Sequence, residues 1–234
     1  MRSAVDERGG GRTERDIYRA AIDLIFERGY HGSSLRTVAA AVGVQMSSFY
    51  YYFPSKQDLL VEIMTRSMEE LIAAVESEVA SADPEPEQRL CAAIRGHILF
   101  HAERRKEAFI LDSEVRALER TGRRLVVKLR DRYEEIFAEV LEEGAARAAL
   151  YVPDLKLVVF ALLAMCTGVA SWYQPGGRLS LESIAEIYAD LTLNGLLVKE
   201  AREVGRHTKP PNTRSRAQAG SKGSSSRRGP RGRS

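Results

Sequence analysis

The sequence predicts an all-α protein of nine helices, with a small N-terminal domain followed by a larger helical domain. Apolar residues recur three and four positions apart along most of the 234-residue chain, which is the spacing of one helix face. A helix-turn-helix with glycine at its turn is recognisable between residues 33 and 56. No segment shows the apolar–polar alternation of a β-strand. With 44% hydrophobic residues, the chain is long enough to bury a substantial core.

Composition divides the chain into four parts. Residues 1–12 are charged and glycine-rich, and residues 204–234 consist mainly of Ser, Arg, Gly and Pro, so we expect both ends to be disordered. Residues 13–56 form the predicted first domain and residues 57–203 the second. No secretory signal is visible, and the most apolar run, residues 157–170, is shorter than the ~18 residues of a membrane span. We therefore expect a cytoplasmic protein in which this run is a buried helix or a subunit interface.

The first helix is predicted to begin at Thr13, which can cap it, and to end at Gly29. Two short helices follow. The first of them has an apolar face of Leu35, Val38, Ala39 and Val42, and Gly43 comes next, where a C-terminal cap needs a positive φ. The core continues on the second short helix through Phe49, Tyr50 and Phe53, and Pro54 stops it. Such a pair of helices presents its second member, residues 45–52, to the major groove of DNA.

This segment resembles the DNA-binding domain of the TetR family of transcriptional repressors. The residues that carry the resemblance are Gly29, Tyr30, Ser33, Ser34, Val38, Ala39, Gly43, Val44, Tyr50, Phe53, Lys56 and Leu59. The chain departs from the family pattern at Met46 and Ser47, where the family often has Lys-Gly, and at Tyr51, where it often has histidine. The resemblance implies a nine-helix repressor whose N-terminal domain binds DNA and whose C-terminal helices bind a small molecule and dimerise. The departures leave the operator sequence open.

The side chains expected to contact DNA lie on the two short helices and at the start of the fourth. Gln45 can pair with an adenine edge and Met46 can contact a thymine methyl, while hydroxyl groups donate to phosphates or bases. The resemblance implies phosphate contacts for Tyr50, Tyr51 and Lys56. For Tyr50, packing in the aromatic core is the equal alternative. The full set of expected DNA-binding residues is Ser34, Arg36, Thr37, Gln45, Met46, Ser47, Ser48, Tyr50, Tyr51 and Lys56.

The remaining helices follow from caps, turns and apolar stripes. Ser55 and Asp58 begin the fourth helix, whose stripe runs to about Val79. After a turn at residues 83–86 come a fifth helix, a short sixth over about 107–118, a break at 121–122 and a seventh helix to about 147. The eighth begins at Pro153 and ends at residues 172–173, and the ninth opens at Ser180. Cys91 and Cys166 lie far apart within these helices, which indicates buried free thiols.

The resemblance places a ligand pocket and a dimer interface in the second domain. We expect the pocket to be lined by Ile98, His101, Phe109, Leu129, Tyr133, Met165, Val169 and Trp172. We expect the interface to be formed by Leu157, Phe160, Leu163, Ile184, Leu191 and Leu196, the alternative being that they are intramolecular core. His97 and His101 share a helix face, but no third ligand completes a metal site, so we expect no metal and no cofactor.

One short motif suggests the chemistry of the ligand. Residues 172–180, WYQPGGRLS, resemble a subgroup of the family that regulates lipid or steroid breakdown and responds to acyl-CoA thioesters. An acyl-CoA needs cations for its phosphates. Arg104, Arg105, Lys106 and Arg178 are candidates, and a solvated surface cluster is the alternative reading of these residues.

Charge is distributed unevenly along the chain. Residues 1–56 carry a net charge of +2, residues 57–203 carry −8, and residues 204–234 hold nine basic residues and no acid. We therefore expect DNA contact to be confined to the N-terminal domain, with the basic tail either a non-specific DNA arm or a passive terminus. The leading hypothesis is a homodimeric repressor released from a palindromic operator by a small molecule. A sequence-indifferent DNA organiser that uses the tail is the alternative, and no catalytic motif indicates an enzyme.

Overall fold

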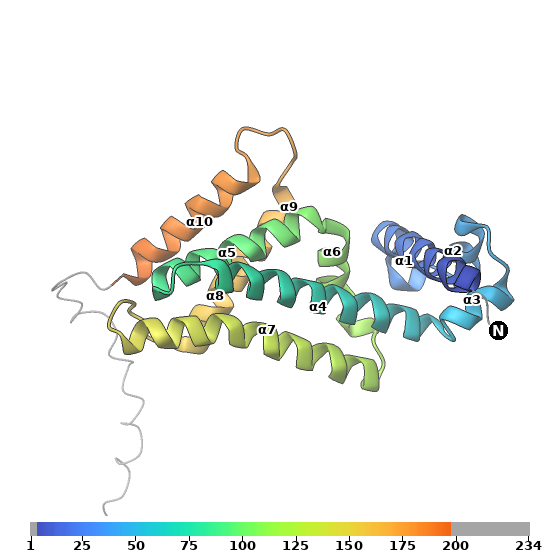
Figure 1. Ribbon diagram of the computed structural model, residues 1–234, viewed down its shortest axis with the longest axis horizontal. Coiled ribbons are helices and arrows are strands. Elements are labelled where there is room, and N and C mark those ends of the chain that lie inside the picture. Colours follow the sequence, from blue (N-terminus) through green and yellow to red (C-terminus); the bar gives the residue numbers. More distant parts are fainter. Residues whose placement is uncertain (1–3, 198–234) are drawn as a thin grey trace, which may run out of the picture. The chain divides into compact units, whose positions relative to one another are not determined.

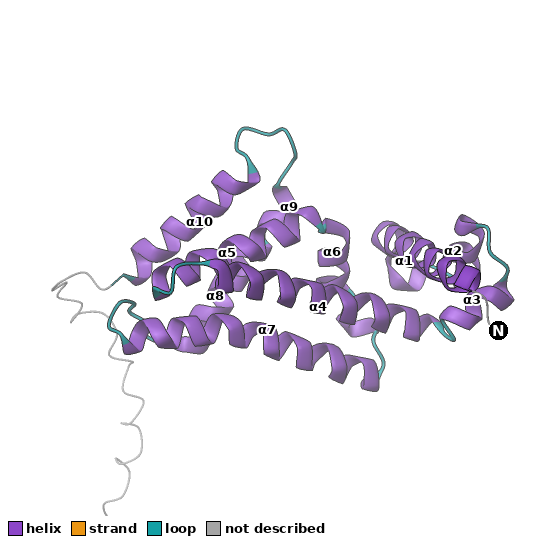
Figure 2. Cartoon of the chain, viewed as in Figure 1, coloured by secondary structure: helices purple, strands orange, loops and turns teal. Residues whose placement is uncertain are grey.

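The computed structural model describes the backbone of residues 4–197 and the side chains of residues 11–197. Within this range it is all-α, as predicted, with no strand and one isolated β-bridge between Leu150 and Leu197 (Figure 2). The described helices, labelled in Figure 1, are α1 (Ala4–Gly32), α2 (Leu35–Val42), α3 (Met46–Tyr52), α4 (Lys56–Ser81), α5 (Pro86–Glu103), α6 (Arg105–Ser113), the 3-10 helix η1 (Val115–Ala117), α7 (Arg120–Ala146), α8 (Leu155–Thr167), α9 (Val169–Trp172) and α10 (Leu181–Leu196). The predicted eighth helix is thus divided at Gly168 into α8 and α9. The predictions for residues 198–234 lie outside the described part.

The N-terminal helices form the expected helix-turn-helix. Gly43 has φ 69° and ψ 28° and caps α2 in the left-handed region, as predicted. Gly29 has φ 70° and ends the regular part of α1. The start of α1 differs from the prediction, because its backbone is already helical at Ala4, nine residues before Thr13. The run of glycines at residues 9–11 suggested disorder because glycine lowers helix propensity, but that cost of about 1 kcal/mol per residue can be overridden by the surrounding helix.

Helix α4 passes from the helix-turn-helix into the core of the larger domain. The predicted capping box at its start is present: the Ser55 hydroxyl accepts from the Asp58 amide at 3.1 Å and donates to the Asp58 carboxylate at 2.7 Å. Its buried face runs from Leu59 to Val79. Helices α5 and α7 pack along α4 and against each other (Figure 1). One helix therefore contributes to both domains.

Two helix boundaries in the middle of the chain differ from the prediction. Helix α6 ends at Ser113 and gives way to η1, so the expected sixth helix over 107–118 is two shorter elements. The expected break at residues 121–122 lies inside the first turn of α7. Gly122 is there for a different reason: it is buried against α4, where an added Cβ would come within 2.3 Å of Val61 Cγ2.

The apolar run of α8 and α9 is longer than the sequence suggested. Residues 155–172 have a mean hydropathy of 1.9, which by length and composition alone would suffice to cross a membrane. Only 22% of these residues are buried inside the protein. The expectation of a mostly buried helix is therefore wrong, because much of this apolar surface has no partner within the chain. The other expectation, a subunit interface, stays a prediction.

Gly122→Ala should destabilise the protein because α7 cannot approach α4 as closely with a methyl group at this position. We expect a loss of about 1–3 kcal/mol in the free energy of unfolding, the usual cost of overpacking. Urea denaturation measures it. Gly195→Ala on α10 is the matched control: no atom lies within 4 Å of the added Cβ, so helix propensity should leave its stability unchanged or higher. Equal stabilities of the two variants would show that the α4–α7 contact is not tight.

Candidate DNA interface and ligand cavity

Helix α3, the second short helix, is buried on one side and exposed on the other. Phe49 is fully buried and anchors α3, whereas Tyr51 is 83% exposed. Gln45, Ser47 and Ser48 are also exposed, so they share the outer surface of α3 as predicted. Met46 differs, because its side chain is half-buried and packs against the core. The outer surface of α3 is therefore polar and aromatic, with little basic charge.

Tyr50 does not belong to the core. Its side chain is 51% exposed and meets Phe49 only at the ring edge, with centroids 6.3 Å apart. The expectation that Tyr50 continues the core is therefore wrong; the sequence pattern misplaced it because it adjoins the buried Phe49 on a short helix. The alternative reading, an outward phenol available to a phosphate, is compatible with its position.

The start of α2 contributes a second group of polar side chains. Ser34 caps α2 by accepting from the Thr37 amide at 3.1 Å, and the two hydroxyl groups lie 2.7 Å apart. Ser34 and Arg36 are exposed and Thr37 is half-buried. The backbone amides at this N-terminus favour anions. Together α2 and α3 form one surface of neutral donors, to which Arg36 adds one cation.

Lys56 lies at the start of α4, beside this surface. Its ammonium nitrogen is 4.2 Å from the centroid of the Tyr30 ring, a cation–π contact. Partial burial lowers the pKa of Lys56 below its ordinary value. The ring fixes the ammonium in place without neutralising it, which suits a positioned phosphate contact.

The residue after Lys56 joins three elements. The side-chain Nε2 of Gln57 donates to the Tyr30 hydroxyl at 2.7 Å and to the Ala117 backbone carbonyl at 2.8 Å. The side-chain Oε1 of Gln57 accepts from the Glu119 backbone amide at 3.0 Å. The Tyr30 amide donates in turn to the Glu114 carboxylate at 3.1 Å. We call these contacts the Gln57 clamp. They connect the end of α1 and the start of α4 with the segment between α6 and α7.

The larger domain contains a cavity of about 540 Å³. It is bounded by α4, α5, α6, α7 and α8–α9, and its wall is mixed, with apolar Met68, Leu71 and Leu163 beside polar and charged groups. Of the eight predicted pocket residues, His101 and Tyr133 line it. The cavity wall also carries polar and charged side chains that were not predicted to line it, which are Asp112, Arg130, Glu134, Thr167 and Ser171. Charged residues on a helix ordinarily face water, so nothing in the sequence distinguished these.

A second cavity of about 580 Å³ adjoins the first, since Asp112, Thr167 and Ser171 line both. It reaches the N-terminal domain through Phe26 of α1, whose ring meets that of Phe109 edge-on at 5.1 Å between centroids. Lys106 and Asp23 pair across the same α1–α6 seam at 2.6 Å. The two cavities together therefore extend from the core of the larger domain to α1, the first helix of the N-terminal domain.

The remaining predicted pocket residues lie elsewhere. Phe109 lines the second cavity, whereas Ile98 and Val169 are fully buried in the core. Leu129 is half-buried, and Met165 and Trp172 are exposed. Apart from Phe109, none of these residues lines either cavity. Apolar periodicity cannot separate a residue that fills the core from one that borders a space within it.

Of the four candidate cations for phosphates, only Arg105 lines the second cavity. Arg104 pairs with Glu70 and Glu107, both at 3.5 Å. Lys106 is occupied by Asp23. Arg178 is exposed in the loop before α10. Arg130, which was not among the candidates, lines the first cavity and lies 3.7 Å from Asp112.

Two neutral histidines form part of the first cavity. The rings of His97 and His101 stack in parallel with centroids 4.0 Å apart, and the His101 Nδ1–H donates to the His97 carbonyl at 3.0 Å. His97 is hydrogen-bonded to the Tyr133 hydroxyl and, at 3.0 Å, to the Thr167 hydroxyl. Burial lowers the pKa of His97 well below its ordinary value and that of His101 to about 4. His101 Nε2 is thus an acceptor on the cavity wall, and stacked rings do not converge on a metal.

The predicted interface residues divide into exposed and buried groups. Leu157, Phe160 and Leu191 are 66%, 45% and 62% exposed, which is unusual for large apolar side chains. Leu163 and Leu196 are half-buried. Ile184 is buried within the chain, so for this residue the alternative of intramolecular core holds. It turns inward from α10, where helical spacing could not show which neighbour covers it.

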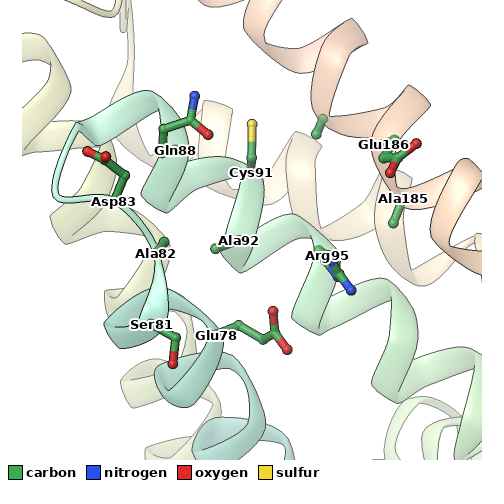
Figure 3. A pocket seen from close by; sticks show the side chains of 11 residues that line it. Glu78, Ser81, Ala82, Asp83, Gln88, Cys91, Ala92, Arg95, Ala185 and Glu186 are labelled. Carbon is green, nitrogen blue, oxygen red and sulfur yellow. The ribbon is translucent and has the colours of Figure 1, made fainter.

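A third, smaller cleft of about 320 Å³ lies between α4, α5 and α10. Figure 3 shows four of its lining residues, Cys91 and Arg95 on α5, Glu78 on α4 and Glu186 on α10. Cys91 is half-buried rather than buried, and burial raises its thiol pKa. Cys166 is buried as expected, with a pKa raised by burial to about 12. Neither thiol is activated as a nucleophile.

Comparison with protein families gives two matches that agree with this architecture. Residues 17–63 match the model described as bacterial regulatory proteins, tetR family. Residues 83–196 match the model described as tetracyclin repressor-like, C-terminal domain.

Individual relatives are similar over most of their length. The HTH-type transcriptional repressor KstR2 of Rhodococcus jostii is 26% identical over 191 residues, covering 81% of this chain and 92% of that protein. The structure of the TetR-family regulator PfmR from Thermus thermophilus has a TM-score of 0.69 and 29% identity over 76% of this chain and 97% of its own. The structure of AibR in complex with isovaleryl coenzyme A and operator DNA has a TM-score of 0.70 and 28% identity, again over 76% and 97%.

The buried histidines predict a stability that falls with acid. In the unfolded chain an imidazole takes up its proton near pH 6.5, whereas burial lowers the pKa of folded His101 to about 4. The free energy of unfolding therefore decreases as pH falls from about 6.5 to about 4. At pH 5 the loss from His101 should be about 2 kcal/mol relative to pH 7.5. Urea unfolding of His101→Gln at the two pH values should show a smaller difference than wild type. The exposed His31, replaced by Gln, is the control; an unchanged pH difference in His101→Gln would contradict the assignment.

Proposed function

Because the chain belongs to the TetR family of bacterial regulatory proteins, we propose that it is a homodimeric repressor released from a palindromic operator by an acyl-CoA thioester. The division of labour is the predicted one, in which residues 13–56 read DNA and residues 57–203 bind the effector and dimerise. KstR2 and PfmR, which resemble this chain over most of their length, are regulators, and this favours a regulator in the cytoplasm over an enzyme.

The observation that carries the DNA-binding role is the asymmetry of α3. Phe49 fixes one face of the helix in the core, while Gln45, Ser47 and Tyr51 project from the other. A rigidly held helix with free polar side chains is what base and phosphate contacts in a major groove require. Because this surface carries few cations, affinity for one half-site should be modest. Two copies of α3, one DNA turn apart, would supply the rest.

Dimerisation is supported by the apolar surface of α8 and α10. Leu157, Phe160 and Leu191 are large side chains left exposed within one chain, and they lie on the two most apolar helices of the described part. Burying them against a second copy would remove them from water, at about 25 cal/mol per Å². A homodimer also matches the two-fold symmetry of a palindromic operator.

The residues that line the two adjoining cavities offer the chemistry that an acyl-CoA needs. The first offers an apolar wall for an acyl chain and a neutral acceptor, His101 Nε2, for an amide N–H of the pantetheine arm. The second offers Arg105 for a phosphate group. AibR, which is 28% identical, binds isovaleryl coenzyme A. The WYQPGGRLS motif resembles the same subgroup.

A ligand in the cavities would release DNA through α6, which connects the cavity wall to the N-terminal domain. Asp112 borders both cavities, and Glu114, two residues later, accepts from the Tyr30 amide at 3.1 Å. A ligand that displaces this end of α6 would therefore displace the junction of α1 and α4. The second cavity also touches α1 directly at Phe26. Binding in either place changes how the DNA-binding domain is held.

The test is equilibrium binding of the full chain to its own upstream DNA, with a shuffled duplex of the same length as the competitor. We expect preference for the upstream DNA and a loss of affinity of about 5–150-fold with one member of a panel of acyl-CoA thioesters, the range of typical coupling energies. Tyr51→Ala should weaken binding of the upstream DNA without changing stability, because Tyr51 is 83% exposed.

Each failure has a separate meaning. Specific binding that ignores every thioester would remove the acyl-CoA assignment and keep the repressor. Binding without sequence preference would favour the alternative, a DNA organiser that uses the basic tail.

A further inference from the structure

We propose that Arg120, Arg123 and Arg124, at the start of α7, form a second phosphate-binding surface for the operator duplex. This surface would hold backbone phosphates next to those reached from α3 and Lys56. The inference rests on the proposed DNA-binding function, but it concerns residues outside the helix-turn-helix. Neither the sequence motif nor the short helices identify them.

These cations line an open groove of about 530 Å³. Lys128 adds a fourth positive charge, Leu118 and Val127 supply apolar wall, and Asp131 is the one acid. All four cations are exposed, and among the described residues none of them takes part in an ion pair. By contrast, residues 57–203 as a whole carry a net charge of −8. A concentrated positive surface on an acidic domain attracts a polyanion.

The groove begins beside the DNA-binding residues. The Glu119 amide, one residue before Arg120, donates to the Gln57 side chain at 3.0 Å, and Gln57 adjoins Lys56. Within the first turn of α7, Gly122 packs against Val61 of α4. Helices α4 and α7 then lie side by side (Figure 1). Arg120 therefore lies close to the predicted phosphate contact at Lys56, and Arg123 and Arg124 follow within about 6 Å along the helix axis.

The spacing of the charges suits a nucleic-acid backbone. From Arg120 to Lys128 the helix rises about 12 Å, while one DNA strand carries a phosphate for about every 3.4 Å of duplex axis. Three or four phosphates can therefore face this stripe. Asp131 at the far end would repel further phosphates, which limits the contact to the part nearest Lys56.

A nucleotide-containing ligand fits the groove less well. No aromatic side chain lines it, so an adenine base would find no ring to stack on. The cavity assigned to the effector is lined by a different set of α7 residues, Arg130, Tyr133 and Glu134. The groove and the effector cavity share none of their lining residues.

The experiment compares the salt dependence of DNA binding for three full-length proteins. These are wild type, the variant Arg120→Gln/Arg123→Gln/Arg124→Gln, and the control Arg95→Gln/Arg132→Gln/Arg147→Gln, which loses the same charge elsewhere. Each phosphate contact contributes about 0.9 to the slope of log K against log salt. Each protomer loses three contacts, which is about 2.7 in slope, so for the proposed homodimer we expect the slope of the α7 variant to be shallower by up to about 5.4. Between about 50 and 200 mM KCl, the affinity of the variant should thus fall less steeply than that of wild type, by up to about 40-fold for each protomer in the complex.

The control should retain the wild-type slope. Equal slopes for the two variants would overturn the proposal. So would an unchanged slope together with weaker isovaleryl-CoA binding, which would assign the groove to the phosphates of the effector. Measuring both the upstream and the shuffled duplex keeps the proposed function separate: loss of sequence preference in wild type contradicts the repressor, whereas the slope difference on either duplex still tests the phosphate contact.

Discussion

Helix α4 packs against α1 of the N-terminal domain and against α5 and α7 of the larger domain, and the rest of the structure depends on how its first turn is held. Its buried face runs from Leu59 to Val79, so α4 cannot rotate without disturbing the core of the larger domain. Its start, however, is fixed by hydrogen bonds to other elements. Gln57 donates to Tyr30 and Ala117 and accepts from Glu119, which ties the helix-turn-helix to the segment between α6 and α7. The position of the helix-turn-helix against the larger domain therefore depends on contacts with the segment between α6 and α7.

The same hydrogen bonds connect the walls of the cavities to the helix-turn-helix. Of the helices that border the first cavity, α4 and α7 begin at the Gln57 clamp and α6 ends beside it. Asp112 on the cavity wall lies two residues before Glu114 of the clamp. The neutral histidines carry no positive charge into the cavity at physiological pH, since burial lowers the pKa values of both. The acyl chain of the proposed ligand can therefore pack beside them without meeting a buried imidazolium, while Arg105 lines the adjoining cavity.

The sequence predicted the DNA-binding domain better than the effector site, for a physical reason. The helix-turn-helix is specified by local rules: a glycine with positive φ at Gly43, a serine cap at Ser34, and a buried aromatic at Phe49. The cavity is specified by packing between distant helices, which no local pattern reveals. Hence Ile98 and Val169 were assigned to the pocket but fill the core, while Arg130 and Glu134 line the cavity although their charges suggested solvent. Tyr50 failed for a related reason, because a short helix leaves the face of each residue undetermined.

The most direct test of this account is the coupling between the two sites when the clamp is removed. Gln57→Leu abolishes all three hydrogen bonds, and Gln88→Leu on α5 is the matched control away from the junction. The measurement is the affinity for isovaleryl-CoA, or for the thioester that releases wild type, with and without saturating upstream DNA. Linkage requires that DNA weaken the effector as much as the effector weakens DNA. The ratio of the thioester Kd with DNA to the Kd without DNA measures this coupling. We predict a ratio well above one in wild type and Gln88→Leu, and a ratio near one in Gln57→Leu. An undiminished ratio in Gln57→Leu, or a wild-type ratio of one, would contradict the account.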